Sequence, residues 1–81
     1  PVITLNRAVA VLKIDGPQAA LDVIAPLAEA LDGYFYYHGA RGSFLRDLGR
    51  NADARAAFAR AISLANTAAE AAHIRRQLDQ L

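Results

Sequence analysis

The chain has 81 residues, and nine Lys and Arg against eight Asp and Glu give it a formal net charge of +1. This near balance gives the chain no strong overall attraction to nucleic acid or anionic lipid. It contains neither cysteine nor methionine, which excludes disulfides and thiolate chemistry, and we expect it to be a piece excised from a longer protein. No apolar run approaches the ~20 residues that span a bilayer, and no signal peptide is present, so we expect a cytoplasmic location.

Apolar residues at helical spacing predict a first helix over 2–14 that ends before a Gly-Pro turn. Its predicted apolar stripe consists of Leu5, Ala8, Val9 and Leu12. A second helix is predicted from Pro17 to about Ala30, with Ala25 and Ala28 on its apolar face. Pro26 lies inside this segment, and we expect it to kink one continuous helix because proline removes a backbone hydrogen bond.

Three further helices are predicted. The third covers 34–48 and stops at Gly49, since glycine suits the position just after a helix. The fourth ends near Asn66. Thr67 and Glu70 have the spacing of a capping box, in which Thr67 caps the amide near Glu70 and Glu70 reaches back, so a fifth helix is predicted up to about Leu81. No segment alternates like a strand, so the predicted fold is all-α with antiparallel helical hairpins.

An internal repeat relates the first helix pair to the second. Gly16 and Gly49 stand at equivalent turns, 33 residues apart (49 − 16 = 33). A helix–turn–helix unit with a period near 34 is typical of tetratricopeptide repeats. The second unit best shows the small, large and aromatic order of that pattern, at Gly42, Leu45, Gly49, Ala54, Phe58 and Ala61. We therefore predict two tetratricopeptide-like repeats, 1–32 and 33–66, and a capping helix, 67–81; the alternative is an alanine-rich bundle with coincidental spacing.

Several stretches suggest a closer relationship. They are Pro1 to Val11 with its Leu-Asn-Arg-Ala-Val-Ala run, Asp15-Gly16-Pro17, Tyr37 to Arg41, Leu45 to Arg50, and Ala57 to Ala61. Together these stretches resemble the C-terminal tetratricopeptide-like extension of one group of extracytoplasmic-function (ECF) sigma factors of bacterial RNA polymerase. The resemblance covers essentially the whole chain, although the usual third repeat is missing or reduced to the fifth helix.

This resemblance implies that the parent protein is a bacterial transcription initiation factor that this region modulates. The implied partners are the sigma domains of the parent chain, the RNA polymerase core or a separate regulator. DNA would be contacted only through parent domains that lie outside these residues. A monomer or weak homodimer is expected, without membrane contact.

The candidate binding residues are those that repeat geometry places on a shallow concave face lined by the first, third and fifth helices. They are Asn6, Arg7, Lys13, Tyr36, Arg46, His73 and Gln77. For Asn6 and Arg7 a structural role stays open, in which Arg7 pairs with an acid and Asn6 bonds a loop backbone. In the aromatic run 34–37, we expect Tyr36 to face the groove, with Phe35 and one tyrosine in the core.

Other polar residues favour structural roles. His38 and Arg41 share a helix face without a second metal ligand at matching spacing, and Ser43 points elsewhere, so we expect both to belong to an interior hydrogen-bond network. Arginines 46, 50, 55 and 60 alternate with acids rather than aromatics, which indicates a solvated face. Gly39 and Gly42 have no phosphate-loop context and favour close helix packing.

No catalytic, cofactor-binding or metal-binding residue is expected, and we predict that the chain is not an enzyme. The leading hypothesis is a protein-interaction domain that regulates a sigma factor. The alternative is a structural or dimerisation module with no role specific to transcription, because a short repeat array leaves an apolar end face unless its last helix covers it.

Overall fold

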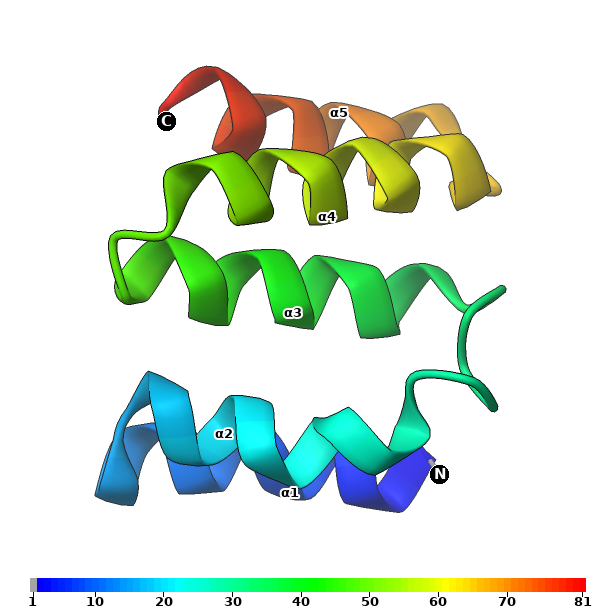
Figure 1. The fold of residues 1–81 in the computed structure, drawn as a ribbon. Coiled ribbons are helices and arrows are strands. Elements are labelled where there is room, and N and C mark those ends of the chain that lie inside the picture. Colours follow the sequence, from blue (N-terminus) through cyan, green and yellow to red (C-terminus); the bar gives the residue numbers. More distant parts are fainter. Residues whose placement is uncertain (1) are drawn as a thin grey trace.

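The computed structural model describes residues 2–81, and Pro1, where the first predicted repeat and the resemblance begin, lies outside this range. Within the described range the chain forms five α-helices and one short 3₁₀-helix, with no strand (Figure 1). Their bounds are α1 Val2–Asp15, α2 Pro17–Ile24, η1 Ala25–Leu27, α3 Phe35–Asp47, α4 Asn51–Leu64 and α5 Ala68–Asp79. The predicted all-α fold is confirmed.

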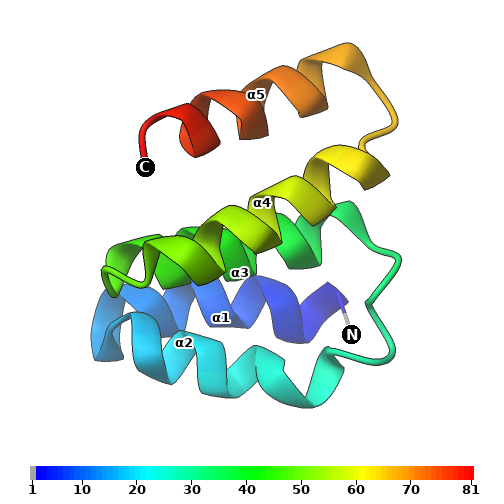
Figure 2. The same cartoon turned by 45° about the horizontal axis from the view of Figure 1, so that its top comes forward.

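Consecutive helices run in opposite directions, so that α1, α3 and α5 point the same way (Figure 1). α1 packs against α2, α3 against α4, and α4 against α5, and α2 also contacts α3. The described part of the chain measures 31 × 25 × 18 Å. Figure 2 shows α5 stacked beyond α4, on the side of α3 away from the first hairpin.

The central helix α3 divides the core into two apolar clusters. The first joins α1, α2 and α3 and contains Leu5, Ala8, Ala20, Ile24, Leu31, Tyr37 and Phe44. The second joins α3, α4 and α5 and contains Phe35, Leu45, Ala54, Ala57, Phe58, Ala61 and Ile74. Because α3 contributes to both clusters, buried residues occur on several of its faces. As predicted, Phe35 and Tyr37 are core residues while Tyr36 is 54% exposed.

The structural repeat has a period of 34 residues, one more than the glycine turns indicated. The fully buried alanines Ala20 and Ala54 are 34 apart (54 − 20 = 34), as are the buried residues Ile24 and Phe58 (58 − 24 = 34). The offset of 33 between the two glycines would instead pair Phe58 with Ala25, which is exposed. Gly16 is the residue directly before α2, whereas an extra residue, Arg50, stands between Gly49 and α4.

The prediction of one kinked helix from Pro17 to Ala30 was also wrong. α2 ends at Ile24, the 3₁₀-helix η1 follows, and turns continue through residue 33. Pro26 is the physical reason, because it has no N–H to donate and its ring collides with the carbonyl four residues back in a regular α-helix. As a consequence Ala25 and Ala28, expected on an apolar face, are exposed.

The α3–α4 turn depends on Gly49. Its φ is +76°, a conformation that side chains disfavour. The N–H of Gly49 donates to the Arg46 carbonyl and that of Arg50 to the Leu45 carbonyl, both at 2.9 Å. This pair of bonds is the Schellman arrangement that ends many helices, and the predicted role of Gly49 is confirmed.

Substituting Gly49→Ala is expected to lower the free energy of unfolding by about 1–2 kcal/mol, since a Cβ is strained at positive φ. Gly33→Ala is the matched control, because Gly33 lies in an open turn without positive φ. Urea denaturation of both variants measures the difference. Equal stability of the two would contradict the strain argument.

α5 begins with the predicted Thr67 cap, although its second bond differs from expectation. The Glu70 amide donates to Thr67 Oγ1 at 3.1 Å. The Glu70 carboxylate accepts from the backbone N–H of Asn66 at 2.8 Å rather than from that of Thr67. The carboxylate still covers a free amide at the start of the helix, where the helix dipole favours negative charge.

Candidate functional site

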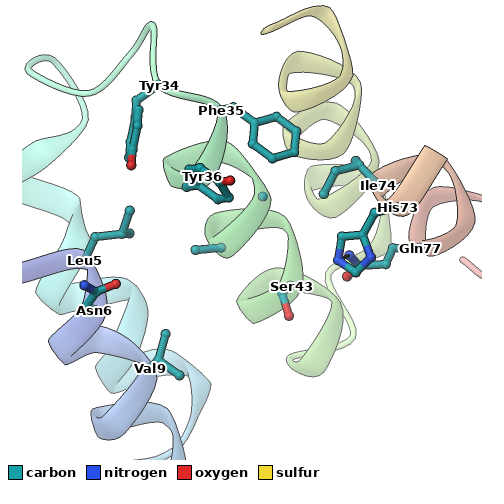
Figure 3. A pocket seen from close by; sticks show the side chains of 12 residues that line it. Leu5, Asn6, Val9, Tyr34, Phe35, Tyr36, Ser43, His73, Ile74 and Gln77 are labelled. Atoms are coloured by element: carbon teal, nitrogen blue, oxygen red, sulfur yellow. Dashed lines mark hydrogen bonds between the residues drawn. The ribbon is translucent and has the colours of Figure 1, made fainter. Parts of the chain in front are cut away.

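A groove of about 520 Å³ lies across α1, α3 and α5 (Figure 3). Residues of α1 form one wall, the N-terminal half of α3 with Tyr34 forms the floor, and α5 forms the other wall. The lining residues are Leu5, Asn6, Val9, Tyr34, Phe35, Tyr36, Gly39, Ala40, Ser43, His73, Ile74 and Gln77. A second cavity, of about 210 Å³, is smaller.

The floor is low because Gly39 and Ala40 have no large side chains. A Cβ placed on Gly39 would meet Ile74 Cδ1 at an ordinary contact distance of 3.4 Å, so the Ile74 side chain of α5 reaches this part of α3. Val9 stands on the opposite wall and is 46% exposed. The prediction that Val9 points into the core was therefore wrong: it faces the groove from α1.

A hydrogen-bonded chain of polar side chains connects α3 and α5 at one end of the groove. Arg46 donates to Gln77 Oε1 at 2.9 Å and to Ser43 Oγ at 3.1 Å. Since Oε1 of Gln77 faces Arg46, its Nε2 donates to His73 Nε2 at 3.1 Å. Asp47 lies 3.5 Å from Arg46 Nε and offsets its charge. These contacts hold His73 and Gln77 in place on the wall.

Tyr36 and Glu70 connect α3 and α5 at the other end of the groove. The Tyr36 hydroxyl donates to Glu70 Oε2 at 3.2 Å, and the other carboxylate oxygen caps Asn66. The Tyr36 ring also makes edge contacts with Tyr34 and Phe35, at centroid distances of 5.5 and 5.0 Å. The hydrogen bond to Glu70, followed by the negative charge of Glu70, raises the pKa of Tyr36 above 10.0.

The Glu70→Gln substitution is expected to lower the pKa of Tyr36 towards 10.0, because the charge that opposes tyrosinate is removed. Since folding raises this pKa, the contribution of the contact to stability is present below pH ~10 and is lost as the pH rises through the folded-state value. NMR titration of the tyrosine Cζ resonances measures the shift. Tyr37 is the internal control, because burial is the main cause of its raised pKa. An unchanged titration midpoint of Tyr36 would contradict the attribution of its raised pKa to Glu70.

Of the seven predicted binding residues, four line the groove: Asn6, Tyr36, His73 and Gln77. Arg46 is half-buried behind the wall and bonds two lining residues. Arg7 and Lys13 are exposed on α1 and do not line the groove, so the structure does not place them with the other five. They turn away because the groove-facing positions of α1 are 5, 6 and 9.

Asn6 and Arg7 are both exposed, a point that the sequence by itself left open. α1 packs mainly against α2, which leaves these positions open to solvent. Asn6 stands on the rim of the groove, with its amide directed towards the space between α1 and α3 (Figure 3).

The structure places His38 in the interior, as expected. His38 is 8% exposed, and its Nε2–H donates to the Asp32 carbonyl at 2.6 Å. Arg60 of α4 bonds the same turn, reaching the Asp32 carbonyl and carboxylate at 3.3 and 3.4 Å. The turn between η1 and α3 is thus held from two helices. Arg41 is half-buried in a smaller cavity of about 210 Å³ on the α2 side of α3.

The other two arginines of the expected solvated face, Arg50 and Arg55, are both exposed. Arg50 pairs with Asp53 at 2.7 Å, and Arg55 lies on α4. Among residues 2–81 the structure brings no three His, Cys, Asp or Glu side chains together in a geometry that holds a metal ion. No helix in that range is long and apolar enough to cross a membrane.

Eight lining residues were missed as site residues from the sequence: Leu5, Val9, Tyr34, Phe35, Gly39, Ala40, Ser43 and Ile74. The sequence did carry a signal for the small lining residues. Ser43 follows Gly39 by four residues and Ala40 by three, so the three residues lie on one face of α3. For Val9 no local signal separates the groove face of α1 from its core face.

The fold and the groove define an all-α protein built of two helical hairpins and a fifth helix, with a concave face between its odd-numbered helices. The chain is similar to an uncharacterized protein of Rhizobium meliloti (strain 1021), with 64% identity over all 81 residues. The chain spans 19% of the length of that relative. No protein-family model matches the chain, and no solved structure matches it.

Proposed function

We propose that this chain is a protein-interaction domain that regulates a bacterial sigma factor of the ECF group during transcription initiation. The observation that carries the binding role is the groove, which combines an apolar floor with neutral polar side chains held in fixed positions. The assignment to sigma factors rests on the sequence resemblance described above. On this proposal the domain works in the cytoplasm and has no catalytic activity.

The proposed partners are the sigma domains of the parent protein, the polymerase core or a separate regulator. Grooves with an apolar floor and a polar rim are typical of surfaces that bind other molecules. The similar protein of Rhizobium meliloti is about five times as long as this chain, which is compatible with a domain that acts beside others.

The first test is direct binding of the 81-residue chain to RNA polymerase core and to the sigma domains, measured by biolayer interferometry. Saturable binding to either supports the proposal. A second test compares promoter-dependent transcription in vitro by the parent protein with and without these residues. Unchanged transcription together with no binding would refute the regulatory role.

A structural or dimerisation module is the second candidate, because α1 exposes two large apolar side chains outside the groove. Ile3 and Ile14 are 84% and 81% exposed, and their spacing of eleven residues places them on one face of the helix. Light scattering at increasing concentration tests this candidate. A dimer that the Ile14→Glu substitution dissociates would favour it, and a monomer at every concentration would exclude self-association.

A further inference from the structure

We infer that the groove holds an extended, uncharged segment of a partner protein, with one large apolar side chain seated between Val9, Tyr36 and Ile74 above Gly39. This inference rests on the proposed protein-binding function, but it does not depend on the sigma-factor assignment. It specifies the chemistry of the occupant, which the resemblance leaves open.

The floor determines the apolar part of the occupant. Val9, Tyr36 and Ile74 line the groove together with Gly39 and Ala40, which carry no large side chain of their own. A volume of about 520 Å³ admits a few side chains but not a whole helix, which is ~10 Å across with its side chains. A leucine or aromatic side chain placed here buries apolar surface on both partners.

The rim determines the charge of the occupant. Of the described residues that line the groove, none is Lys, Arg, Asp or Glu. Two charged side chains bond lining residues, and both already have partners: Arg46 with Gln77, Ser43 and Asp47, and Glu70 with Tyr36 and Asn66. A charged group entering the groove would lose water without gaining an opposite charge. The groove therefore selects an uncharged segment.

The rim also determines the conformation of the occupant. Asn6 on α1 and Gln77 with His73 on α5 face each other across the apolar floor (Figure 3). Amide side chains both donate and accept, which matches the N–H and C=O groups of a peptide backbone. A helix uses these backbone groups internally, whereas an extended segment presents them on both edges. An extended segment therefore meets both rims at once.

Two pairs of adjacent residues on α1 provide the test variants. Val9→Glu places a charge in the apolar seat, and Ala10→Glu places the same charge on the next residue, which is exposed and does not line the groove. Asn6→Ala removes a rim amide, and Arg7→Ala truncates its exposed neighbour. All four positions are exposed, so the variants are expected to fold, and circular dichroism checks this.

The probe is a phage-displayed library of short random peptides, followed by synthetic peptides with acetylated and amidated ends that carry no terminal charge. We expect enriched peptides to share one large apolar residue flanked by uncharged ones. Val9→Glu should weaken the affinity of such a peptide at least ~10-fold, and Asn6→Ala about fivefold through one lost hydrogen bond. Ala10→Glu and Arg7→Ala should leave it unchanged.

Three results would overturn the inference: no enrichment, enrichment of acidic or basic peptides, or equal effects within each pair of variants. Two combinations of results distinguish a failure of this inference from a failure of the proposed function. Binding of polymerase or sigma domains that Val9→Glu does not weaken would leave the regulatory role standing and place its contact elsewhere. Enriched apolar peptides, together with no binding to polymerase or sigma domains and unchanged transcription, would support the groove chemistry and refute the transcription role.

Discussion

The Phe58→Ala substitution is expected to lower the free energy of unfolding by about 3–5 kcal/mol, the typical cost of deleting a buried phenylalanine ring. Phe58 is completely buried at the contact between α3 and α4. Domains of this size have roughly 4–12 kcal/mol of stability, at 0.05–0.15 kcal/mol per residue. Urea denaturation should therefore show a variant close to the limit of folding.

The same ring explains why residue 42 is glycine. A Cβ at Gly42 would lie 2.6 Å from Cδ1 and Cε1 of Phe58, closer than any real contact. Gly42→Ala is expected to destabilise by about 1–2 kcal/mol, because overpacking outweighs the gain of up to ~1 kcal/mol in helix propensity. Gly39→Ala is the control on the same helix, since its Cβ would meet Ile74 at an ordinary 3.4 Å. It should be neutral or slightly stabilising.

A double-mutant cycle tests the contact directly. Replacing Phe58 by leucine should remove part of the clash, so that Gly42→Ala costs less in the Phe58→Leu background than alone. Residues in direct contact couple by about 0.5–3 kcal/mol. Additive free energies in this cycle would show that the Gly42 position is not limited by the Phe58 ring.

The second large effect is expected from Ile74→Ala, at about 2–5 kcal/mol for a buried isoleucine, and it should act mainly on α5. Ile74 is the buried residue of α5 within the described range, with Leu78 half-buried beside it. The polar links to α3, Tyr36–Glu70 and Arg46–Gln77, are exposed or only partly buried. Exposed polar contacts of this kind contribute little to the free energy of unfolding on their own.

Hydrogen exchange measures this prediction residue by residue. Amides of α5 should lose protection in Ile74→Ala while those of α1, α2 and α3 keep most of theirs, because local units open below the global free energy. Arg75→Ala, at the exposed next position, is the control. Equal loss of protection in all helices would show that α5 unfolds only with the whole domain. Detachment of α5 would also remove one wall of the groove, so peptide binding should fall with it.

Much of the fold was predictable because it depends on local chemistry. Helical spacing of apolar residues located the helices, and the caps at Gly49 and Thr67 depend only on neighbouring backbone groups. The aromatic run was also interpreted correctly, since Phe35 and Tyr37 lie on buried faces and Tyr36 on an open one. These features follow from the residues themselves and the turns beside them.

The predictions that failed depended on tertiary position. The exception is Pro26, which was expected to kink a helix and instead ended it for a local reason, since proline lacks an N–H and its ring collides with the preceding turn. Val9 and Leu5 have the same apolar character, and only the placement of α3 and α5 decides that Leu5 is core and Val9 is groove wall.

By itself the sequence determined the all-α class and helix ends such as those at Gly49 and Thr67, because hydrogen bonding within helices and turns is local. Only the tertiary structure decided that Asn6, Tyr36, His73 and Gln77 share a groove while Arg7 and Lys13 do not. The reason is geometric: a groove is formed between helices, and its lining depends on how α1, α3 and α5 are rotated and spaced. That arrangement is determined by long-range contacts such as Gly42 with Phe58 and Gly39 with Ile74.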